Sequence, residues 1–409
     1  MCGGFGSKKG SCGNEVKFPN KSPYCSNCAG ESFEYHIARL FEIQGCEVKR
    51  NIKNFSTQTD FFAKHKHGFI KAGILVECKW KFNEKDTVKG DEVRIFNSSW
   101  ELFNKSGTYG SADKAFLVTN GRFSPEASEM AKNLNIELWT ENDLIGQLID
   151  FRPYLGNLID EYTKSNLPGH YIELNSTSGV ELAEDIKTVL FEDDSNSLVV
   201  LGDYGCGKTS VCLKICYDFA LRIMNGDSVA PLPIYIKLRK YNKAVDIESL
   251  ITNLLVNECK IQNANIITFK EFLLYSNTIL IFDGFDEIAK RVDSAVKYEV
   301  LNEITKFVSD RTKVLITCRP NFFNQRQEFE NIFKSSPIYF EPNLKTVFFE
   351  EVEIADLSVK QIKEYIGSYE NELLKKGFNF IDFLKVLDDV HDLWDLAKRP
   401  VLLNIIIVT

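Results

Sequence analysis

The segment Leu198–Ser210, LVVLGDYGCGKTS, has the residue types and spacing of a phosphate-binding loop. It contains the pattern G-x-x-x-x-G-K-[ST] without a mismatch, between an apolar run and an apolar-periodic helix. Backbone N–H groups and a helix N-terminus would therefore converge on phosphate oxygens. We expect Lys208 to pair with the β- and γ-phosphates and Thr209 to ligate Mg²⁺. The predicted nucleotide-binding residues are Gly202, Asp203, Tyr204, Gly205, Cys206, Gly207, Lys208, Thr209 and Ser210.

A second apolar run ends in the acidic sequence Asp283-Gly-Phe-Asp286-Glu287. In a doubly wound parallel sheet, ligands bind at the carboxyl ends of the strands. We therefore expect Asp283 to hold the Mg²⁺ of the nucleotide, and Asp286 or Glu287 to polarise the attacking water. The next predicted strand brings Arg319 to the same edge, where it could sense the γ-phosphate or simply lie on the surface.

Asp60, Glu77 and Lys79 have the residue types that metal-assisted phosphodiester hydrolysis requires. A predicted hairpin carries them, and Glu77 and Lys79 share one face because strand side chains two apart point the same way. The two carboxylates would hold one or two Mg²⁺ ions, and the lysine would orient or activate a water. Glu34 would project from the preceding helix toward the same cluster. The alternative is a solvated sheet edge, because E-x-K alone is common by chance.

The elements that must position these side chains follow from hydrophobic periodicity. A helix with Phe33, Ile37, Leu40 and Phe41 on its apolar face begins near Gly30. After the hairpin, we expect a helix near 91–103, a strand at 115–121, a helix at 124–133, a strand at 136–139 and a closing segment at 144–148.

This segment resembles the Mrr-like restriction endonucleases of the PD-(D/E)xK superfamily. The resemblance lies in Phe33-Glu34, in Asp60, in Glu77-Cys78-Lys79 and in the order of elements over most of residues 30–150. It implies cleavage of DNA that depends on Mg²⁺ or Mn²⁺. Two phenylalanines follow Asp60 and no proline precedes it, which departs from the usual pattern of that family.

Residues 168–405 resemble the NACHT family of signal-transduction NTPases. The paired acids after Asp283, the Thr-Cys-Arg319-Pro strand, and Pro400, at the place of the family's proline near the nucleotide base, carry this resemblance. It implies that ADP holds a closed state and that exchange for ATP opens and oligomerises the protein. Preference for ATP over GTP is likewise an implication of the family. NACHT proteins normally continue into a winged-helix region and a sensor, so we expect either a truncated form or a separate sensor subunit.

Four cysteines lie in the first 29 residues, which are rich in Gly, Ser, Lys and Asn. Cys25 and Cys28 form one C-x₂-C pair, whereas Cys12 lacks a partner at the expected spacing and Cys2 lies near the terminus. Four thiolates would make a structural Zn²⁺ site. The alternative is a tail with incidental cysteines.

The composition is that of an ordinary globular protein, with 44% hydrophobic and 26% charged residues among 409. No apolar run approaches the roughly 18 residues of a membrane span, and no secretory signal is evident. The 11 cysteines, one of them in the phosphate loop, favour a reducing, cytoplasmic compartment. Residues 1–165 carry 22 Lys and Arg against 21 Asp and Glu, so any attraction to DNA must be local.

The predicted fold class is α/β, with a restriction-endonuclease-like αβ domain followed by a P-loop NTPase built on a doubly wound parallel sheet. The predicted domains are a cysteine-containing segment at 1–29, an endonuclease at 30–150, a linker at 151–175, a NACHT core at 176–345 and the start of a helical region at 346–409.

The predicted function is that of a bacterial antiphage-defence NACHT NTPase, in which nucleotide-dependent oligomerisation activates the Mg²⁺-dependent DNA endonuclease. The alternatives are a non-cleaving NTP-dependent scaffold that binds nucleic acid, and an NTP-driven DNA-translocating restriction subunit. The expected partners are DNA, further copies of the chain, and a trigger that is a phage product or a separate sensor subunit. No membrane association is expected.

Overall fold

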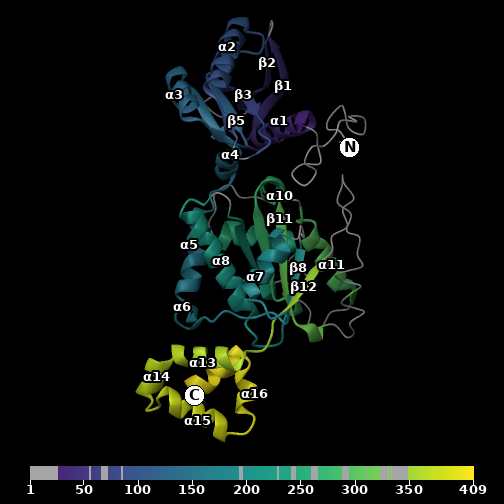
Figure 1. Ribbon diagram of the computed structural model, residues 1–409. Coiled ribbons are helices and arrows are strands. Elements are labelled where there is room, and N and C mark those ends of the chain that lie inside the picture. The colour runs from purple at the N-terminus through teal and green to yellow at the C-terminus, as the bar shows by residue number, and fades with distance from the viewer. Residues whose placement is uncertain are drawn as a thin grey trace. The chain divides into compact units, whose positions relative to one another are not determined.

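The computed structural model of the chain contains two compact units, residues 1–148 and 149–409, each with its own five-stranded sheet (Figure 1). The structure describes residues 26–54, 57–65, 72–83, 86–192, 197–227, 230–240, 246–258, 266–287, 294–309, 311–322, 330, 333 and 349–409. No helix in these ranges is both long enough and apolar enough for a bilayer span.

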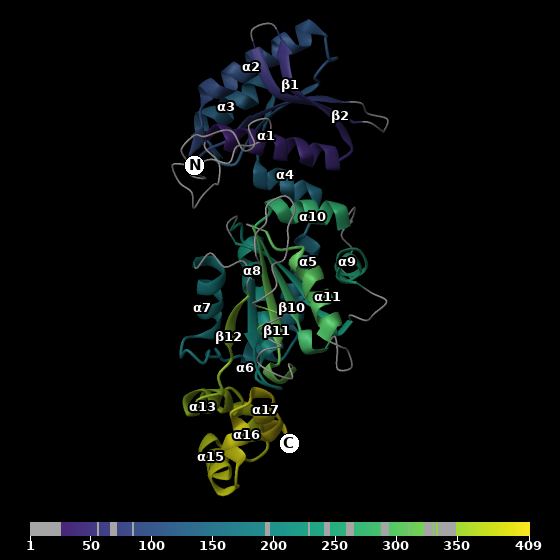
Figure 2. The same cartoon turned by 90° about the vertical axis from the view of Figure 1, so that its right-hand side faces the viewer.

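The first unit is built on a mixed sheet with the strand order β1-β2-β3-β5-β7. The first three strands pair antiparallel, and the last three pair parallel. Helices cover both of its faces, α1 and α4 on one and α2 and α3 on the other (Figure 2). The bounds are α1 Ser26–Ile43, β1 Cys46–Asn54, β2 Thr57–His65, β3 Gly73–Lys79, β4 Thr87–Val88, α2 Gly90–Ser106, β5 Lys114–Thr119, β6 Arg122–Phe123, α3 Pro125–Leu134, β7 Ile136–Thr140 and α4 Glu141–Leu148.

The two phenylalanines after Asp60 belong to the two hydrophobic cores of this unit. Successive strand residues point to opposite faces of a sheet. The Phe61 ring lies 5.4 Å from that of Phe41 on α1, and the Phe62 ring lies 5.1 Å from that of Phe103 on α2. The two phenylalanines that depart from the family pattern therefore pack against α1 and α2, on opposite faces of β2.

The second unit is built on a parallel sheet with the order β12-β8-β11-β10-β9. Helices lie on both sides of it, α7 on one and α11 on the other (Figure 2). Four of its strands, β8 to β11, are almost entirely buried, as in other doubly covered sheets, whereas the edge strand β12 carries three glutamates. The predicted α/β class is confirmed. The strands are β8 Ser197–Leu201, β9 Leu232–Lys237, β10 Thr278–Asp283, β11 Thr312–Cys318 and β12 Glu350–Glu353.

The last helices of the chain, α13 to α17, gather beyond one end of this sheet (Figure 1). That end carries the phosphate loop, because the Val401 N–H donates to the Gly205 carbonyl at 3.2 Å. The helices of the unit are α5 Arg152–Thr163, α6 Leu167–His170, α7 Leu182–Lys187, α8 Lys208–Met224, α9 Ile247–Thr252, α10 Ile266–Tyr275, α11 Ser294–Thr305, α13 Val359–Ser368, α14 Glu370–Lys375, α15 Phe380–Asp389, α16 Leu393–Ala397 and α17 Pro400–Val408.

The first half of the predicted linker, 151–175, forms the helix α5. Pro153 lies in the first turn of that helix, where a missing N–H costs nothing. Leu155 and Leu158 are buried, and α5 packs against α8. A turn-rich composition therefore concealed a helix that belongs to the second unit.

We predict that Tyr154→Phe destabilises the second unit. The Tyr154 hydroxyl accepts the Tyr235 N–H at 2.7 Å, and both residues are buried. The substitution leaves that N–H unsatisfied, which costs about 1–3 kcal/mol. Calorimetry should show a lower midpoint for the transition of the second unit. Arg152→Ala, at an exposed position of the same helix, serves as a control that should leave the midpoint unchanged. Equal midpoints for Tyr154→Phe and wild type would show that α5 is only loosely attached.

Candidate functional sites

In the first unit, Asp60, Glu77 and Lys79 come together at the β2–β3 pairing. The register that pairs Phe61 with Val76 places Asp60 opposite Glu77, on the same face of the sheet. Asp60 Oδ2 accepts the Cys78 N–H at 2.6 Å, and Lys79 Nζ donates to Glu77 Oε1 at 2.8 Å. The structure therefore brings the three predicted nuclease residues into one cluster.

This cluster contains more acidic side chains than basic ones. Burial raises the pKa of Asp60 to about 8, assisted by the carboxylates of Glu77 and Glu34. Burial, and then the Glu77 charge, also raise the pKa of Glu34, which reaches the cluster from α1. Burial opposes the charge on Lys79, but the adjacent Glu77 outweighs it and raises the pKa of the lysine. Three carboxyl groups thus influence one another around one ammonium group.

Glu77 Oε2 shows what this cluster lacks. Within the described residues, this buried oxygen has no hydrogen-bond partner, and such an oxygen is costly unless a cation or a donor satisfies it. Mg²⁺ prefers carboxylate oxygens and keeps several water ligands, so the residues present fit that ion. Among the described residues, no group of three His, Cys, Asp or Glu side chains is arranged to hold a metal ion. The two protein ligands would be Asp60 and Glu77, because the strand register places them opposite each other.

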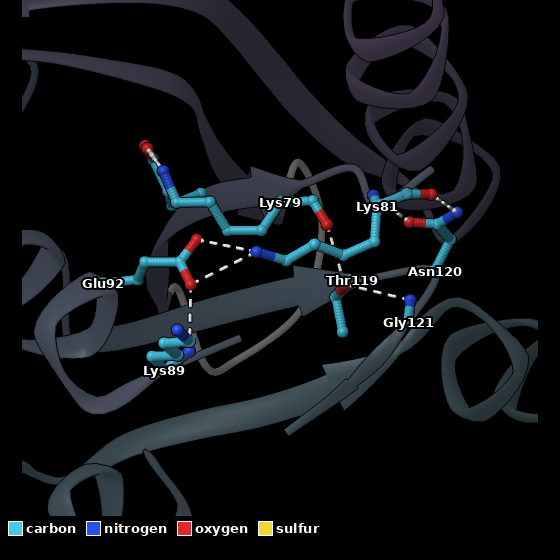
Figure 3. A network of polar contacts seen from close by, with 8 residues as sticks. Lys79, Lys81, Lys89, Glu92, Thr119, Asn120 and Gly121 are labelled. Atoms are coloured by element: carbon cyan, nitrogen blue, oxygen red, sulfur yellow. Dashed lines mark hydrogen bonds and ion pairs between the residues drawn. The ribbon is translucent and has the colours of Figure 1, made fainter. Parts of the chain in front are cut away.

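The end of β5 fixes the backbone that carries Lys79, a role that sequence reasoning missed. Thr119 Oγ1 donates to the Lys79 carbonyl at 2.7 Å, and the Gly121 N–H donates to Thr119 Oγ1 at 3.0 Å (Figure 3). A side chain at position 121 would meet the Asp86 carbonyl at 2.5 Å, so glycine is required there. The run Thr-Asn-Gly at the end of a predicted strand was the sequence feature that could have indicated this role.

In the second unit, the phosphate loop connects β8 to α8. Gly205 and Gly207 have φ values of 77° and 107°, in the left-handed region that favours glycine. A Cβ at Gly205 would lie 2.9 Å from the Cβ of Val401, so the loop also requires glycine for close contact with α17. Lys208 Nζ donates to the carbonyls of Gly202 at 2.6 Å and Asp203 at 3.0 Å, which holds the ammonium group over the loop.

Asp283, at the end of β10, accepts three side-chain hydroxyl groups. Thr209 and Tyr235 donate to Oδ2 at 2.8 and 2.9 Å, and Thr317 donates to Oδ1 at 2.7 Å. The two predicted ligands of the nucleotide's Mg²⁺, Thr209 and Asp283, are therefore in direct contact. Tyr235 was missed by sequence reasoning because it lies on the neighbouring strand β9, and no local pattern marks it.

The acids after Asp283 lie in different surroundings. Asp286 is buried, and its Oδ2 pairs with Arg319 Nε at 2.7 Å. Glu287 is exposed. The Arg319 guanidinium also lies 5.2 Å from the centre of the Tyr204 ring, on the phosphate loop. The predicted sensor arginine therefore joins the loop to Asp286, whereas Glu287 faces solvent.

A cavity of about 200 Å³ opens beside the phosphate loop, at Gly207 and Ser210. Pro400, predicted to lie near the nucleotide base, lines it. The His170 ring, also in the lining, stacks on the Tyr369 ring with centroids 3.6 Å apart. The lining is mostly apolar and aromatic, as in many small-molecule sites.

The predicted zinc ligands Cys2, Cys12 and Cys25 lie outside the described residues. Cys28 is buried near the beginning of α1. The zinc site therefore stays a prediction.

Comparison with known proteins gives two family matches. Residues 25–148 match the restriction endonuclease family Mrr_cat, and residues 196–372 match the NACHT domain family. An uncharacterized WD repeat-containing protein of Nostoc sp. strain PCC 7120 is 25% identical over 323 residues, which cover 72% of this chain. The chain spans only 20% of the length of that relative.

Solved structures are similar to parts of the chain, with low TM-scores. The Walker-type ATPase of Pyrococcus abyssi is 12% identical with a TM-score of 0.32, and the match covers 56% of this chain and 69% of that one. MspJI restriction endonuclease in complex with a 27-mer oligonucleotide is 18% identical with a TM-score of 0.20, covering 29% of this chain and 27% of that one. Likenesses of this size carry no functional argument.

The two family matches confirm both resemblances found in the sequence. The NACHT match includes the phosphate loop and Asp283, and it ends before Pro400. The chain thus joins an Mrr-type restriction endonuclease domain, residues 25–148, to a NACHT domain, residues 196–372.

Proposed function

We propose that this chain is a bacterial antiphage-defence NTPase whose nucleotide-dependent oligomerisation activates its Mg²⁺-dependent DNA endonuclease. The observation that carries the cutting half is the cluster of Asp60, Glu77 and Lys79, with its buried, unpartnered Glu77 Oε2. The family matches support the pairing of a nuclease with a NACHT switch.

The nuclease residues have distinct proposed roles. Asp60 and Glu77 hold Mg²⁺, which when bound polarises the phosphate and lowers the pKa of a water. Lys79, whose ammonium group Glu77 keeps charged, orients that water and stabilises negative charge at the phosphate. Glu34 adds a third carboxyl group that favours a cation in the cluster.

The nucleotide residues are proposed to act as a switch. Lys208 binds the β- and γ-phosphates, Thr209 and Asp283 hold the Mg²⁺ of the nucleotide, and the cavity at Pro400 takes the base. Arg319 senses the γ-phosphate and would then exchange its bond to Asp286 for one to the nucleotide. Asp286 or Glu287 polarises the attacking water.

Contacts of α17 support a switch rather than a simple hydrolase. Pro400 lines the base cavity, and Val401 bonds to Gly205 of the phosphate loop. A nucleotide that fills the cavity and the loop therefore acts directly on the helical region. ATP in place of ADP would move this region, and the exposed surfaces would assemble copies of the chain. The trigger is a phage product or a separate sensor subunit.

We predict that Lys79→Ala and Asp60→Ala abolish cleavage of plasmid DNA in Mg²⁺ and ATP. Each variant removes a group that touches the metal or the phosphate, so a loss of at least about 100-fold is expected. The control is Lys114→Ala, another ion-paired lysine of the same domain, which should cut like wild type. Cutting by Lys79→Ala at the wild-type rate would refute the nuclease assignment and favour a non-cleaving scaffold. Continuous DNA-stimulated ATP hydrolysis would instead favour a translocating restriction subunit.

We predict that Asp60→Asn stabilises the metal-free first unit at alkaline pH. Burial raises the Asp60 pKa from 3.8 to about 8, so the folded protein binds this proton more tightly than the unfolded chain. The stability contributed by that proton is present below pH 4 and is lost as pH rises toward 8. Asparagine carries no charge at either pH value. In calorimetry with EDTA, its midpoint should exceed that of wild type by about 3 °C or more at pH 8, and by much less at pH 5.

The matched control for this measurement is Glu101→Gln, which neutralises an exposed carboxylate on α2. Its midpoint should differ from wild type by the same small amount at both pH values. A wild-type midpoint that parallels that of Asp60→Asn from pH 5 to 8 would mean that Asp60 is ionised throughout.

We predict that Tyr235→Phe weakens the use of Mg²⁺ by the NTPase. The variant removes one of the three hydroxyl groups that orient Asp283. A hydrogen bond to a charged group contributes about 1.5–3 kcal/mol, so the Mg²⁺ concentration for half-maximal ATP hydrolysis should rise about tenfold. Tyr217→Phe, on α8 and stacked on Tyr162, is the control. An unchanged Mg²⁺ dependence in Tyr235→Phe would remove Tyr235 from the site.

A further inference from the structure

Beyond Lys79, the side-chain amide of Asn120 bonds to the backbone of Lys81 in the way that a neighbouring strand would. The last residue of β3 is Lys79, yet the Lys81 N–H donates to Asn120 Oδ1 at 2.6 Å, and Asn120 Nδ2 donates to the Lys81 carbonyl at 2.8 Å. These two bonds have the donor–acceptor pattern of a strand pairing. Together with the bond from Thr119 to the Lys79 carbonyl, they fix the backbone of residues 79–81.

This clamp sets two lysines beside each other. Extended residues two apart point to the same side, and Figure 3 shows the side chains of Lys79 and Lys81 running in the same direction. Glu92 on α2 is near both, because it pairs with Lys81 and its charge also acts on Lys79. Lys81 is therefore the next cation along the chain from the nuclease cluster.

Glu92 holds the Lys81 ammonium group in place without using all its donors. Lys81 Nζ lies 3.0 and 3.2 Å from the two oxygens of Glu92, and the Lys89 N–H donates to the same carboxylate at 2.9 Å. An ammonium group has three donors. Both side chains remain partly open to solvent, with exposed fractions of 19% for Lys81 and 28% for Glu92. A further anion can therefore reach Lys81 while Glu92 stays bonded.

A structural role alone does not account for Lys81. Glu92 caps the first turn of α2 through the Lys89 N–H, and that bond does not involve the lysine. A partly exposed ion pair stabilises a fold only slightly.

The acidic cluster supplies a reason for a second cation. A polynucleotide must bring a phosphate next to the carboxyl groups of Asp60, Glu77 and Glu34, where burial and then the charges of Glu77 and Glu34 already raise the pKa of Asp60. The basic and acidic residues of positions 1–165 nearly cancel, 22 against 21, so attraction must come from local lysines.

We propose that Lys81 binds a backbone phosphate of the DNA strand at the cleavage cluster, with Asn120 and Glu92 as its positioning residues. The proposal rests on the proposed nuclease function. Lys81 contributes to binding, whereas Lys79 contributes to cleavage, so the two lysines have separable effects.

The test is fluorescence anisotropy of a short labelled duplex DNA with the full chain, in Ca²⁺ in place of Mg²⁺, between 50 and 200 mM salt. Lys81→Ala should raise Kd about three- to tenfold and reduce the slope of log K against log salt by about 0.9, the value for one lost phosphate contact. Lys81→Arg should restore the slope. Lys114→Ala, which breaks the Lys114–Glu137 pair at the other end of β5, is the control and should keep the wild-type slope.

A wild-type slope in Lys81→Ala overturns the proposal, whether or not the variant melts earlier. A lower midpoint together with a wild-type slope identifies the Lys81–Glu92 pair as purely structural. If wild type binds and cuts DNA while Lys81→Ala keeps its slope, only the Lys81 proposal falls. If wild type neither binds nor cuts DNA, the nuclease function falls with it.

Discussion

Carboxyl groups held on the strands of a buried sheet are the constraint on which both sites depend. In the first unit, Asp60 and Glu77 face each other across two strands, with Lys79 bonded to only one of their oxygens. In the second, Asp283 ends a strand whose preceding residues are all buried, and it is held by three neutral hydroxyl groups. Hydroxyl donors orient a carboxylate but do not cancel its charge. Both sites are therefore suited to a divalent cation, because the neighbouring side chains do not fully neutralise the carboxylates.

The two sites meet this constraint differently, in keeping with their proposed roles. Asp283 has a donor for both of its oxygens, so its geometry is fixed before any ligand arrives. The nuclease cluster instead keeps one buried oxygen without a partner and raises the pKa of Asp60. Without a metal ion, Asp60 keeps a proton at the position where a metal would bind. If Mg²⁺ binds as proposed, it would displace that proton, and the nuclease would then respond to both pH and metal concentration.

Local patterns were sufficient to predict part of this structure. The phosphate loop, the acids after β10 and the Glu77-Cys78-Lys79 run lie within single elements, and strand alternation alone placed Glu77 beside Lys79. Contacts between distant segments were not predictable in this way. Tyr235 reaches Asp283 across 48 positions, and Asn120 reaches Lys81 across 39. Tertiary burial likewise overrode composition at α5, where Pro153 and Gly156 indicated a linker.

Proton release on Mg²⁺ binding tests the central claim, that Asp60 and Glu77 form a metal site, most directly. Calorimetric titration of the nucleotide-free protein at pH 7, in buffers of different ionisation enthalpy, measures protons released for each ion bound. A pKa of about 8 leaves Asp60 mostly protonated at pH 7, so the account predicts release of about one proton per Mg²⁺. Asp60→Asn should lose this release together with the binding. Binding of Mg²⁺ without proton release, or with equal affinity in Asp60→Asn, would contradict the account.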